Sequence, residues 1–488
     1  MLSLSCLSVI LTAVLVQGYD NGAAHSRLPI MGWSSWVALA PLGEHPIFDY
    51  CDTDSIKATA DAFMELGFPK HNYKHFHLDD CWADPERNAT DFLQPNRAHF
   101  KNGIKEVIDY IHDYDLSFGL YTCAGTHTCV GGLPGSKDHW EQDANVFAEW
   151  GVDFVKMDNC NTGGMGKPED YYPKMSQALN QTGRSIHFNM CEWGKDEPWT
   201  WGGKIAQSWR ATADHHGIWD STKSIVQQIA AVPAKYTGRP YAWNDLDMLE
   251  TGNYDQAAYA NEASLSNMSA VEYHTEFTMW AISASNLVVT TPLMNCTVAN
   301  ATTCDADSLS LSKQLSQSAC ELGTSYGCTT DGSGQMWTDN GCRGKFVCDG
   351  NNLTADVDGA GRHTFQCTQG KPVCEAWISD LQKDILFNDE VIAINQDVTP
   401  QGRPVTEGNL TVWTRNLSDG SIAVVLYNED DDEVQIGFDS HLIGLGANVA
   451  FSARDLWKHQ DLGEFKDGVF APVVVVPHEA KALRVKRV

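Results

Sequence analysis

Beyond its first residues, the 488-residue chain lacks any apolar run of about 18 residues, the length that a membrane-spanning helix needs. It is also poor in basic side chains, with 34 Lys and Arg against 63 Asp and Glu, which gives a formal net charge of −29. Such a charge repels phosphate backbones and anionic lipids. We therefore expect neither a nucleic-acid partner nor a membrane partner, and the sequence leaves the oligomeric state open.

The N-terminal stretch MLSLSCLSVILTAVLVQGYDNG is apolar, too short to span a membrane, and followed by small residues near Gly18. We interpret residues 1–18 as a cleaved secretory signal peptide. A short buried N-terminal segment is the alternative, because the stretch carries no basic side chain. Removing it leaves fourteen of the 15 cysteines, an even number that suits disulfides. Asn-x-Ser/Thr sequons agree with a secreted or vacuolar/lysosomal glycoprotein.

From Leu28 to Val289 the chain alternates short apolar runs with amphipathic segments, a pattern typical of a parallel sheet covered by helices. Eight such strands predict a (β/α)8 barrel. A doubly wound open sheet is the alternative, but no GxGxxG loop follows the first strand. The predicted strands are Pro29–Trp33, Lys74–Leu78, Ser117–Tyr121, Phe154–Met157, Ile186–Met190, Ala206–Ala211, Tyr241–Asp245 and Asn286–Val289.

The pattern changes twice after the eighth strand. Residues 295–374 hold eight cysteines and little helical periodicity, which indicates a disulfide-rich insertion. One amphipathic helix over Trp377–Ile392 then completes a barrel assigned to residues 26–294 and 375–398. Residues 399–488 carry alternating runs such as LTVWTR and SIAVVLYN, which predict a C-terminal antiparallel β-sandwich.

Charged residues close nearly every predicted strand, where a barrel places its chemistry. A lone Asp there usually caps a helix or forms a turn, but caps do not require Lys, Arg and indole rings beside them. Carboxylates and an arginine can bind hydroxyl groups while aromatic faces stack on a sugar ring, so the pattern predicts a carbohydrate pocket. The charged residues are Asp79, Asp80, Lys156, Asp158, Glu192, Arg210, Asp214, Asp245 and Asp247, and the aromatic residues are Trp33, Trp36, Trp82, Tyr121, Trp193, Trp209 and Trp243.

Two of these acids suit the two roles that glycoside hydrolysis requires. Asp158 follows Lys156 by two residues on one strand face, so we expect a lowered pKa and a permanent carboxylate that acts as the nucleophile. Asp214 follows its strand in the looser stretch WRATADHHG, where an exposed carboxyl could act as acid and base.

The segments MGWSSW, HLDDCW, FGLYTCAG, GVDFVKMDNC, SWRATADHHGIWDS and WNDLDMLETGN resemble, in order, the melibiase-type α-galactosidases and the related α-N-acetylgalactosaminidases. The stretch CEWG is most similar to that of the plant and fungal α-galactosidases. The resemblance implies a retaining exo-glycosidase that hydrolyses terminal α-galactosides by double displacement and needs no cofactor or metal.

The resemblance also assigns residues. It places the nucleophile at Asp158 and the acid/base at Asp214, and it implies disulfides between Cys51 and Cys81 and between Cys129 and Cys160. The positions that it implies for substrate binding are Trp36, Asp79, Asp80, Tyr121, Cys129, Lys156, Glu192, Trp193, Arg210, Asp247 and Met248.

Several alternatives stay open. Within the family, an α-N-acetylgalactosaminidase or a β-L-arabinopyranosidase would use the same scaffold. We favour galactose because Trp193 would exclude a 2-acetamido group and the Asp79-Asp80 pair suits a sugar with a 6-hydroxyl.

Outside the family, His75, His77 and Asp79 share a strand face and could ligate a metal, although core histidines are the simpler interpretation. A binding-only lectin would be expected to lack one of the two catalytic acids. His215-His216 could relay protons to Asp214, but we expect the pair to be polar surface.

Overall fold

A computed structural model describes most of the chain as two compact units, each considered separately below. The first 17 residues, which make up nearly all of the predicted signal peptide, lie outside the described residues. No helix among the described residues is both long enough and apolar enough to cross a bilayer. The described residues are 18–38, 51–130, 132–253, 257–259, 262–265, 267–298, 304, 309–329, 335–348, 351–355, 357, 361–366, 372–406 and 411–488.

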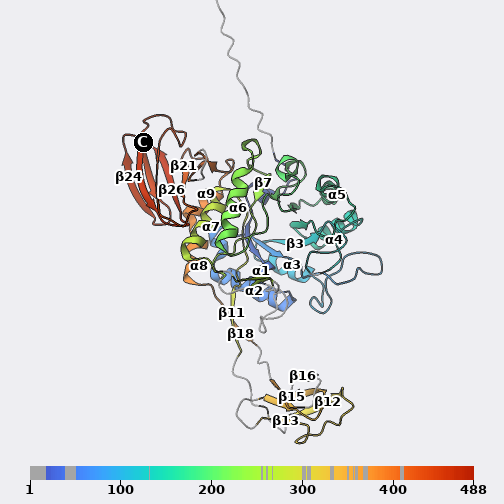
Figure 1. The fold of residues 1–488 in the computed structure, drawn as a ribbon. Helices are drawn as coiled ribbons and strands as arrows, with labels where there is room; N and C mark the ends of the chain where they lie inside the picture. The colour runs from blue at the N-terminus through green and yellow to red at the C-terminus, as the bar shows by residue number, and fades with distance from the viewer. Residues whose placement is uncertain are drawn as a thin grey trace, which may run out of the picture. The chain divides into compact units, whose positions relative to one another are not determined.

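Eight parallel strands form the centre of the larger unit (Figure 1). Their order is β10-β1-β2-β3-β4-β5-β6-β7. An isolated parallel bridge between Leu249 and Val289 joins the chain after β7 to β10. All eight predicted strands are found, and the barrel prediction is confirmed. The strands are β1 Met31–Ser34, β2 His75–Leu78, β3 Ser117–Cys123, β4 Phe154–Asp158, β5 His187–Cys191, β6 Ser208–Arg210, β7 Trp243–Asp245 and β10 Leu287–Val289.

Helices connect successive strands and begin and end at local signals. In α2 the Asp52 side chain accepts a hydrogen bond from the Ser55 amide, and Gly67 ends the helix with a φ of 89°, which glycine adopts readily. The helices that cover the strands are α1 Ser35–Ala38, α2 Thr53–Leu66, α3 Lys105–His112, α4 Trp140–Trp150, α5 Pro168–Gln181, α6 Trp219–Ala231 and α7 Ala270–Ile282, and a short hairpin pairs β8 Ala257–Tyr259 with β9 Glu262–Leu265.

The single helix predicted over Trp377–Ile392 is wrong. The chain forms two short helices, α8 Asp380–Leu386 and α9 Asp389–Asn395. Asn388 separates them, because its side chain accepts hydrogen bonds from the amides of Glu390 and Val391 and so caps a new helix.

The second unit includes residues 294–376. Its small core contains Met336, Phe346 and Cys348, and disulfides join Cys304 to Cys328 and Cys320 to Cys342. Crosslinks suit so small an apolar cluster. The strands are β11 Met294–Val298, β12 Ser310–Gln314, β13 Tyr326–Cys328, β14 Gln335–Thr338, β15 Gly344–Cys348, β16 Asn351–Ala355, β17 His363–Gln366 and β18 Pro372–Ala376.

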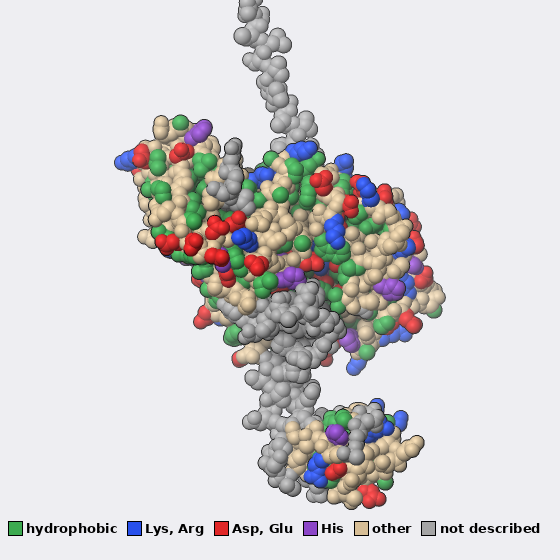
Figure 2. Space-filling model, viewed as in Figure 1, with side chains coloured by type: hydrophobic (Ala, Val, Ile, Leu, Met, Phe, Trp, Pro, Cys, Tyr) green, Lys and Arg blue, Asp and Glu red, His purple; other side chains and the backbone are tan. Residues whose placement is uncertain are grey.

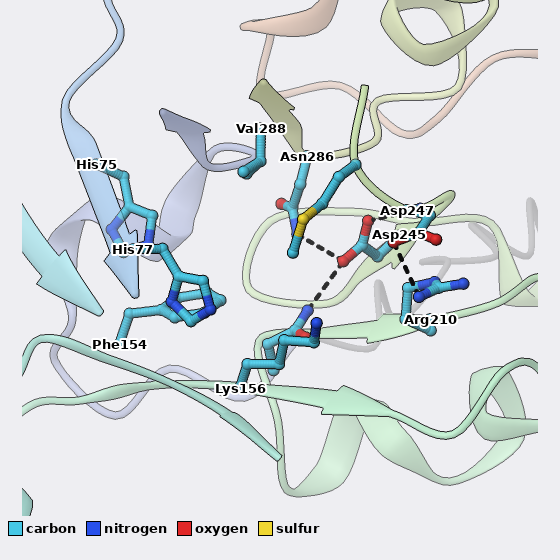
Figure 3. Close-up of a pocket in the computed structure, with 11 residues that line it drawn as sticks. His75, His77, Phe154, Lys156, Arg210, Asp245, Asp247, Asn286 and Val288 are labelled. Atoms are coloured by element: carbon cyan, nitrogen blue, oxygen red, sulfur yellow. Dashed lines mark hydrogen bonds and ion pairs between the residues drawn. The ribbon is translucent and has the colours of Figure 1, made fainter. Parts of the chain in front are cut away.

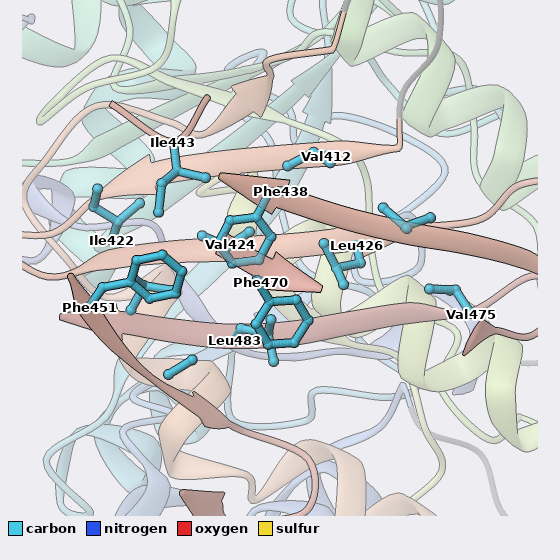
Figure 4. Close-up of a cluster of buried hydrophobic side chains, with 13 residues drawn as sticks. Val412, Ile422, Val424, Leu426, Phe438, Ile443, Phe451, Phe470, Val475 and Leu483 are labelled. Atoms are coloured by element: carbon cyan, nitrogen blue, oxygen red, sulfur yellow. The ribbon is translucent and has the colours of Figure 1, made fainter. Parts of the chain in front are cut away.

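The C-terminal region of the larger unit consists of two antiparallel sheets, as predicted for a sandwich. Alternate residues such as Val424, Leu426, Phe438 and Phe470 face one apolar cluster (Figure 4). Figure 2 shows acidic side chains at many places on the face in view, in agreement with the net charge. The strands are β19 Arg403–Pro404, β20 Val412–Asn416, β21 Ile422–Tyr427, β22 Val434–Asp439, β23 Phe451–Asp455, β24 Gln460–Phe465, β25 Val469–Val475 and β26 Ala480–Arg487.

Candidate active site

A cavity of about 240 Å³ lies at the carboxyl ends of the barrel strands. Parallel strands place these ends at one edge, so residues distant in the sequence meet there. Eight of the residues predicted above as catalytic or substrate-binding line it together with four others. The lining consists of Trp36, Cys129, Val130, Lys156, Asp158, Cys160, Cys191, Trp193, Arg210, Asp214, His216 and Asp247.

Asp79 and Lys156 form a buried ion pair at the base of this site. The Lys156 Nζ lies 2.8 Å from Asp79 Oδ2, and His77 Nε2 lies 3.2 Å from the same oxygen. Burial alone would raise the pKa of Asp79, but Lys156 and His77 together hold it below its usual value. Asp79 is therefore an ionised carboxylate fixed on two sides.

Asp158 ends β4 and is also buried, at 7% exposure. The Tyr121 hydroxyl donates to its Oδ2 at 3.1 Å, and the Asn159 amide donates to its Oδ1 at 2.9 Å. The expected lowering of its pKa is wrong. Burial raises the pKa of Asp158, and the opposing effects of the Lys156 charge and of the Asn159 amide do not reverse this shift.

Arg210 connects two further carboxylates across the opposite wall. Its Nη2 lies 2.9 Å from Asp214 Oδ1 and its Nη1 lies 2.9 Å from Asp247 Oδ1. Burial raises the pKa of Asp247 to about 6, although Arg210 opposes the shift. The Asp214 side chain is 46% exposed, so this carboxyl, unlike Asp158, can exchange protons with solvent.

Aromatic rings and a disulfide complete the wall. Lys156 Nζ lies 5.5 Å from the centre of the Trp36 ring and 5.2 Å from that of Tyr121, both within cation–π range. A disulfide joins Cys129 to Cys160 beside the cavity, and another joins Cys51 to Cys81 just after Asp80.

Five residues assigned to substrate binding lie outside the cavity lining. The Tyr121 hydroxyl donates a hydrogen bond to Asp158, which lines the cavity, and Asp80 Oδ2 accepts one from the amide of the lining residue Val130 at 2.9 Å. Asp79 contacts Lys156, and Met248 lines a smaller inner cavity. Glu192 is fully buried, and neither of its carboxyl oxygens has a hydrogen-bond partner among the described residues. Burial raises the pKa of Glu192 to about 9, so it is a neutral acid behind the site.

Two lining residues were missed, namely Val130 and Cys191, and His216, which we expected at the polar surface, also lines the cavity. Cys191 could have been found from strand periodicity. It is the last residue of β5, two residues after Asn189, which also faces the barrel interior, so the next residue, Glu192, points away. No sequence signal distinguishes Val130.

The histidine predictions have mixed outcomes. His215 is not surface: it is 5% exposed, its Nε2 lies 2.9 Å from the Thr222 hydroxyl, and burial lowers its pKa to about 3. His75 and His77 are buried, and they belong to no cluster of three metal-ligating atoms within the described part of the chain. The one such cluster found among the described residues consists of Asp158 and the two sulfurs of the Cys129–Cys160 disulfide, which cannot act as thiolate ligands.

Comparison with known proteins agrees with this geometry. A family model described as Alpha galactosidase A matches residues 28–309, and one for the alpha-galactosidase C-terminal beta sandwich domain matches residues 407–485. An alpha-galactosidase of Oryza sativa is 33% identical over 95% of this chain and 86% of its own length, and one of Coffea arabica is 33% identical over 91% and 90%. The crystal structure of alpha-galactosidase I from Mortierella vinacea matches with a TM-score of 0.70 and 25% identity, covering 96% of this chain and 98% of that one. The chain belongs to the melibiase-type α-galactosidase family.

Proposed function

We propose that the protein is a retaining exo-glycosidase that hydrolyses terminal α-D-galactosyl residues of oligosaccharides and glycoconjugates. The observation that carries this proposal is the pairing of two differently placed acids in one cavity. Asp158 is buried and hydrogen-bonded at its base, whereas Asp214 is half exposed on its wall. Two hydrogen-bond donors hold Asp158 in one orientation, as a nucleophile requires, and Asp214 reaches the solvent that supplies the water of the second displacement.

The reaction has two displacements. Asp158 Oδ attacks the anomeric carbon while Asp214, as the acid, gives its proton to the departing glycosidic oxygen. Asp214, now a carboxylate, then takes a proton from water, and the resulting hydroxyl attacks the anomeric carbon and releases Asp158. Tyr121 and the Asn159 amide keep the Asp158 carboxylate oriented through both steps.

The remaining lining groups support a hydroxyl-rich sugar. Lys156 and Arg210 offer donors, Asp247 offers acceptors, and Trp36 offers an aromatic face. Trp193 lines the cavity and has a backbone φ of 59°. Its indole ring would occupy the space that a 2-acetamido group needs. Galactose is therefore preferred over its 2-acetamido analogue. We assign no role in direct substrate contact to Glu192.

Secretion belongs to the same proposal. The disulfides of both units and the apolar N-terminal stretch support passage through an oxidising secretory compartment, with delivery outside the cell or to a vacuole.

The test uses p-nitrophenyl α-galactoside, α-N-acetylgalactosaminide and β-L-arabinopyranoside with the wild type, Asp158→Asn and Asp214→Asn, with and without a chelator. We expect release from the α-galactoside alone, unaffected by the chelator and lost in Asp158→Asn. Preferred release from either other sugar would overturn the specificity. Full activity of Asp158→Asn would overturn the assignment of the nucleophile.

A further inference from the structure

A second, smaller cavity of about 30 Å³ lies in the barrel interior and shares Lys156, Arg210 and Asp247 with the catalytic cavity. Figure 3 shows His75 and His77 side by side along one wall of it, with Arg210 and Asp247 on the far side. Both histidines are only 2% exposed. Neither has a role in the mechanism above.

The hydrogen bonds of the two histidines determine which nitrogen carries the proton. His77 Nε2 lies 3.2 Å from the ionised Asp79 carboxylate, which only accepts, so Nε2 is the protonated nitrogen and Nδ1 presents a lone pair. His75 Nδ1 lies 3.0 Å from the Ser117 hydroxyl, which donates its own hydrogen to the Lys74 carbonyl. His75 therefore donates through Nδ1 and presents a lone pair at Nε2. Burial lowers the pKa of both rings, which keeps them neutral.

The two lone pairs are directed at the same space. Among the described residues neither His75 Nε2 nor His77 Nδ1 has a hydrogen-bond partner. A methyl group placed on Gly119 would lie 2.9 Å from His75 Nε2 and 2.7 Å from His77 Nδ1. Both nitrogens therefore lie close to the backbone at Gly119, where any side chain would clash with the two rings. Two buried acceptors without a donor would cost about 1–3 kcal/mol each.

We propose that one buried water molecule in this cavity donates its two hydrogens to His75 Nε2 and His77 Nδ1, and that His77 is thereby a positioning residue for Asp79. A water molecule occupies about 30 Å³ of liquid and needs at least two polar partners, which this cavity provides. It is also the smallest neutral group with two donors, as two facing acceptors require.

This water has a consequence for the catalytic cavity. By accepting at Nδ1, His77 keeps its proton on Nε2, where it supports the same Asp79 oxygen that pairs with Lys156. The effect on catalysis rests on the proposed function and on the prediction, implied by the family resemblance, that Asp79 binds substrate. The presence of the water does not depend on the proposed function, so the water proposal and the proposed function can be disproved separately.

The first arm of the test is a high-resolution crystal structure of the wild-type protein. We expect one density peak within hydrogen-bonding distance of His75 Nε2 and His77 Nδ1, without anomalous signal. An empty cavity would overturn the proposal, and so would a metal ion that persists after chelation and appears in elemental analysis. This arm requires no variant and is independent of activity.

The second arm measures how His77 acts. We expect His77→Leu to raise KM for p-nitrophenyl α-galactoside about tenfold with kcat changed less than about threefold, because a hydrogen bond to a charged group is lost from both ground and transition state. In an Asp79→Asn background the same change should alter KM less than about threefold. His187→Leu is the matched control, since His187 is an equally buried barrel histidine bonded to Ser26 and Ser208. An equal effect of His77→Leu in both backgrounds, or an equal effect of His187→Leu, would contradict a role through Asp79.

Discussion

The barrel strand ends and the space between the C-terminal sheets bury different kinds of side chain, charged in the first and apolar in the second. At the barrel strand ends, Asp79, Lys156 and Arg210 are at most 8% exposed and are satisfied by one another and by neighbouring polar groups. Between the C-terminal sheets, the cluster in Figure 4 consists of aliphatic and aromatic side chains such as Phe438 and Phe470, whose ring centres are 4.9 Å apart.

This difference separates chemistry from stability. Buried charges gain little net stability, because desolvation offsets their attraction. Buried apolar area favours folding at about 25 cal/mol per Å². We therefore expect changes at the barrel strand ends to alter activity more than stability, and changes between the sheets to do the reverse.

The largest effect is expected for Asp158→Asn. The amide cannot form the ester with the sugar, so kcat should fall about 10⁴-fold or more, while the melting temperature stays the same or rises because a buried charge is removed. Steady-state kinetics and thermal unfolding measure the two quantities. Asp220→Asn, an exposed acid on α6, is the control and should change neither.

Asp214→Asn should lower activity by about 10²–10⁴-fold on galactosides with poor leaving groups, because the glycosidic oxygen is no longer protonated. The loss in the first displacement should be smaller with p-nitrophenyl galactoside, whose leaving group needs little protonation. Pre-steady-state release of p-nitrophenol checks this. An equal loss in the first displacement for both leaving groups would contradict the acid role.

Phe438→Ala should act on stability alone. Removing a 5%-exposed ring that packs on Phe451 and Phe470 should lower the free energy of unfolding by about 3–5 kcal/mol. Below the melting temperature kcat should be unchanged. Denaturant unfolding and kinetics measure both, and Leu462→Ala, at a 37%-exposed position of β24, should change little.

The last prediction concerns Glu276→Gln, which removes a buried acid of the barrel outside the catalytic cavity and should change only how stability depends on pH. Burial raises the pKa of Glu276 to about 8 from an ordinary 4.5, so the folded state binds the extra proton between these values. The stability that this group contributes is present below pH 4.5 and is lost as the pH rises toward 8.

Glu276→Gln removes this titration, so the variant should gain melting temperature relative to wild type between pH 5 and pH 8. Glu464→Gln on the exposed edge of β24 is the control and should show no such change. If the two variants respond alike, the buried position of Glu276 does not determine its titration.

Much of this organisation could be predicted from the sequence. Apolar runs bounded by turn residues located all eight barrel strands, and period-2 runs located the C-terminal sheets, because both patterns depend only on local alternation. The strand-end positions also indicated Lys156 and Asp158. Asp214, which follows its strand in the sequence, also lines the cavity. The catalytic roles of these residues stay a prediction.

What could not be predicted depends on burial by distant segments. The pKa of Asp158 is raised because neighbouring strands remove water from it, which the nearby Lys156 in the sequence does not reveal. His215 reads as polar surface until α6 places Thr222 against it. Glu192 follows Cys191 by one residue, and this single step decides which of them faces the cavity.

The most direct test of the central claim is to trap the covalent intermediate. The wild-type protein would be incubated with a fluorinated α-galactosyl fluoride that forms the ester quickly and hydrolyses slowly, then digested and analysed by mass spectrometry. We predict one fluorogalactosyl group on the peptide that contains Asp158, and none after the Asp158→Asn substitution. A label on any other acid, or hydrolysis of the fluoride without a detectable covalent adduct, would contradict the assignment of Asp158 as the nucleophile of a retaining enzyme.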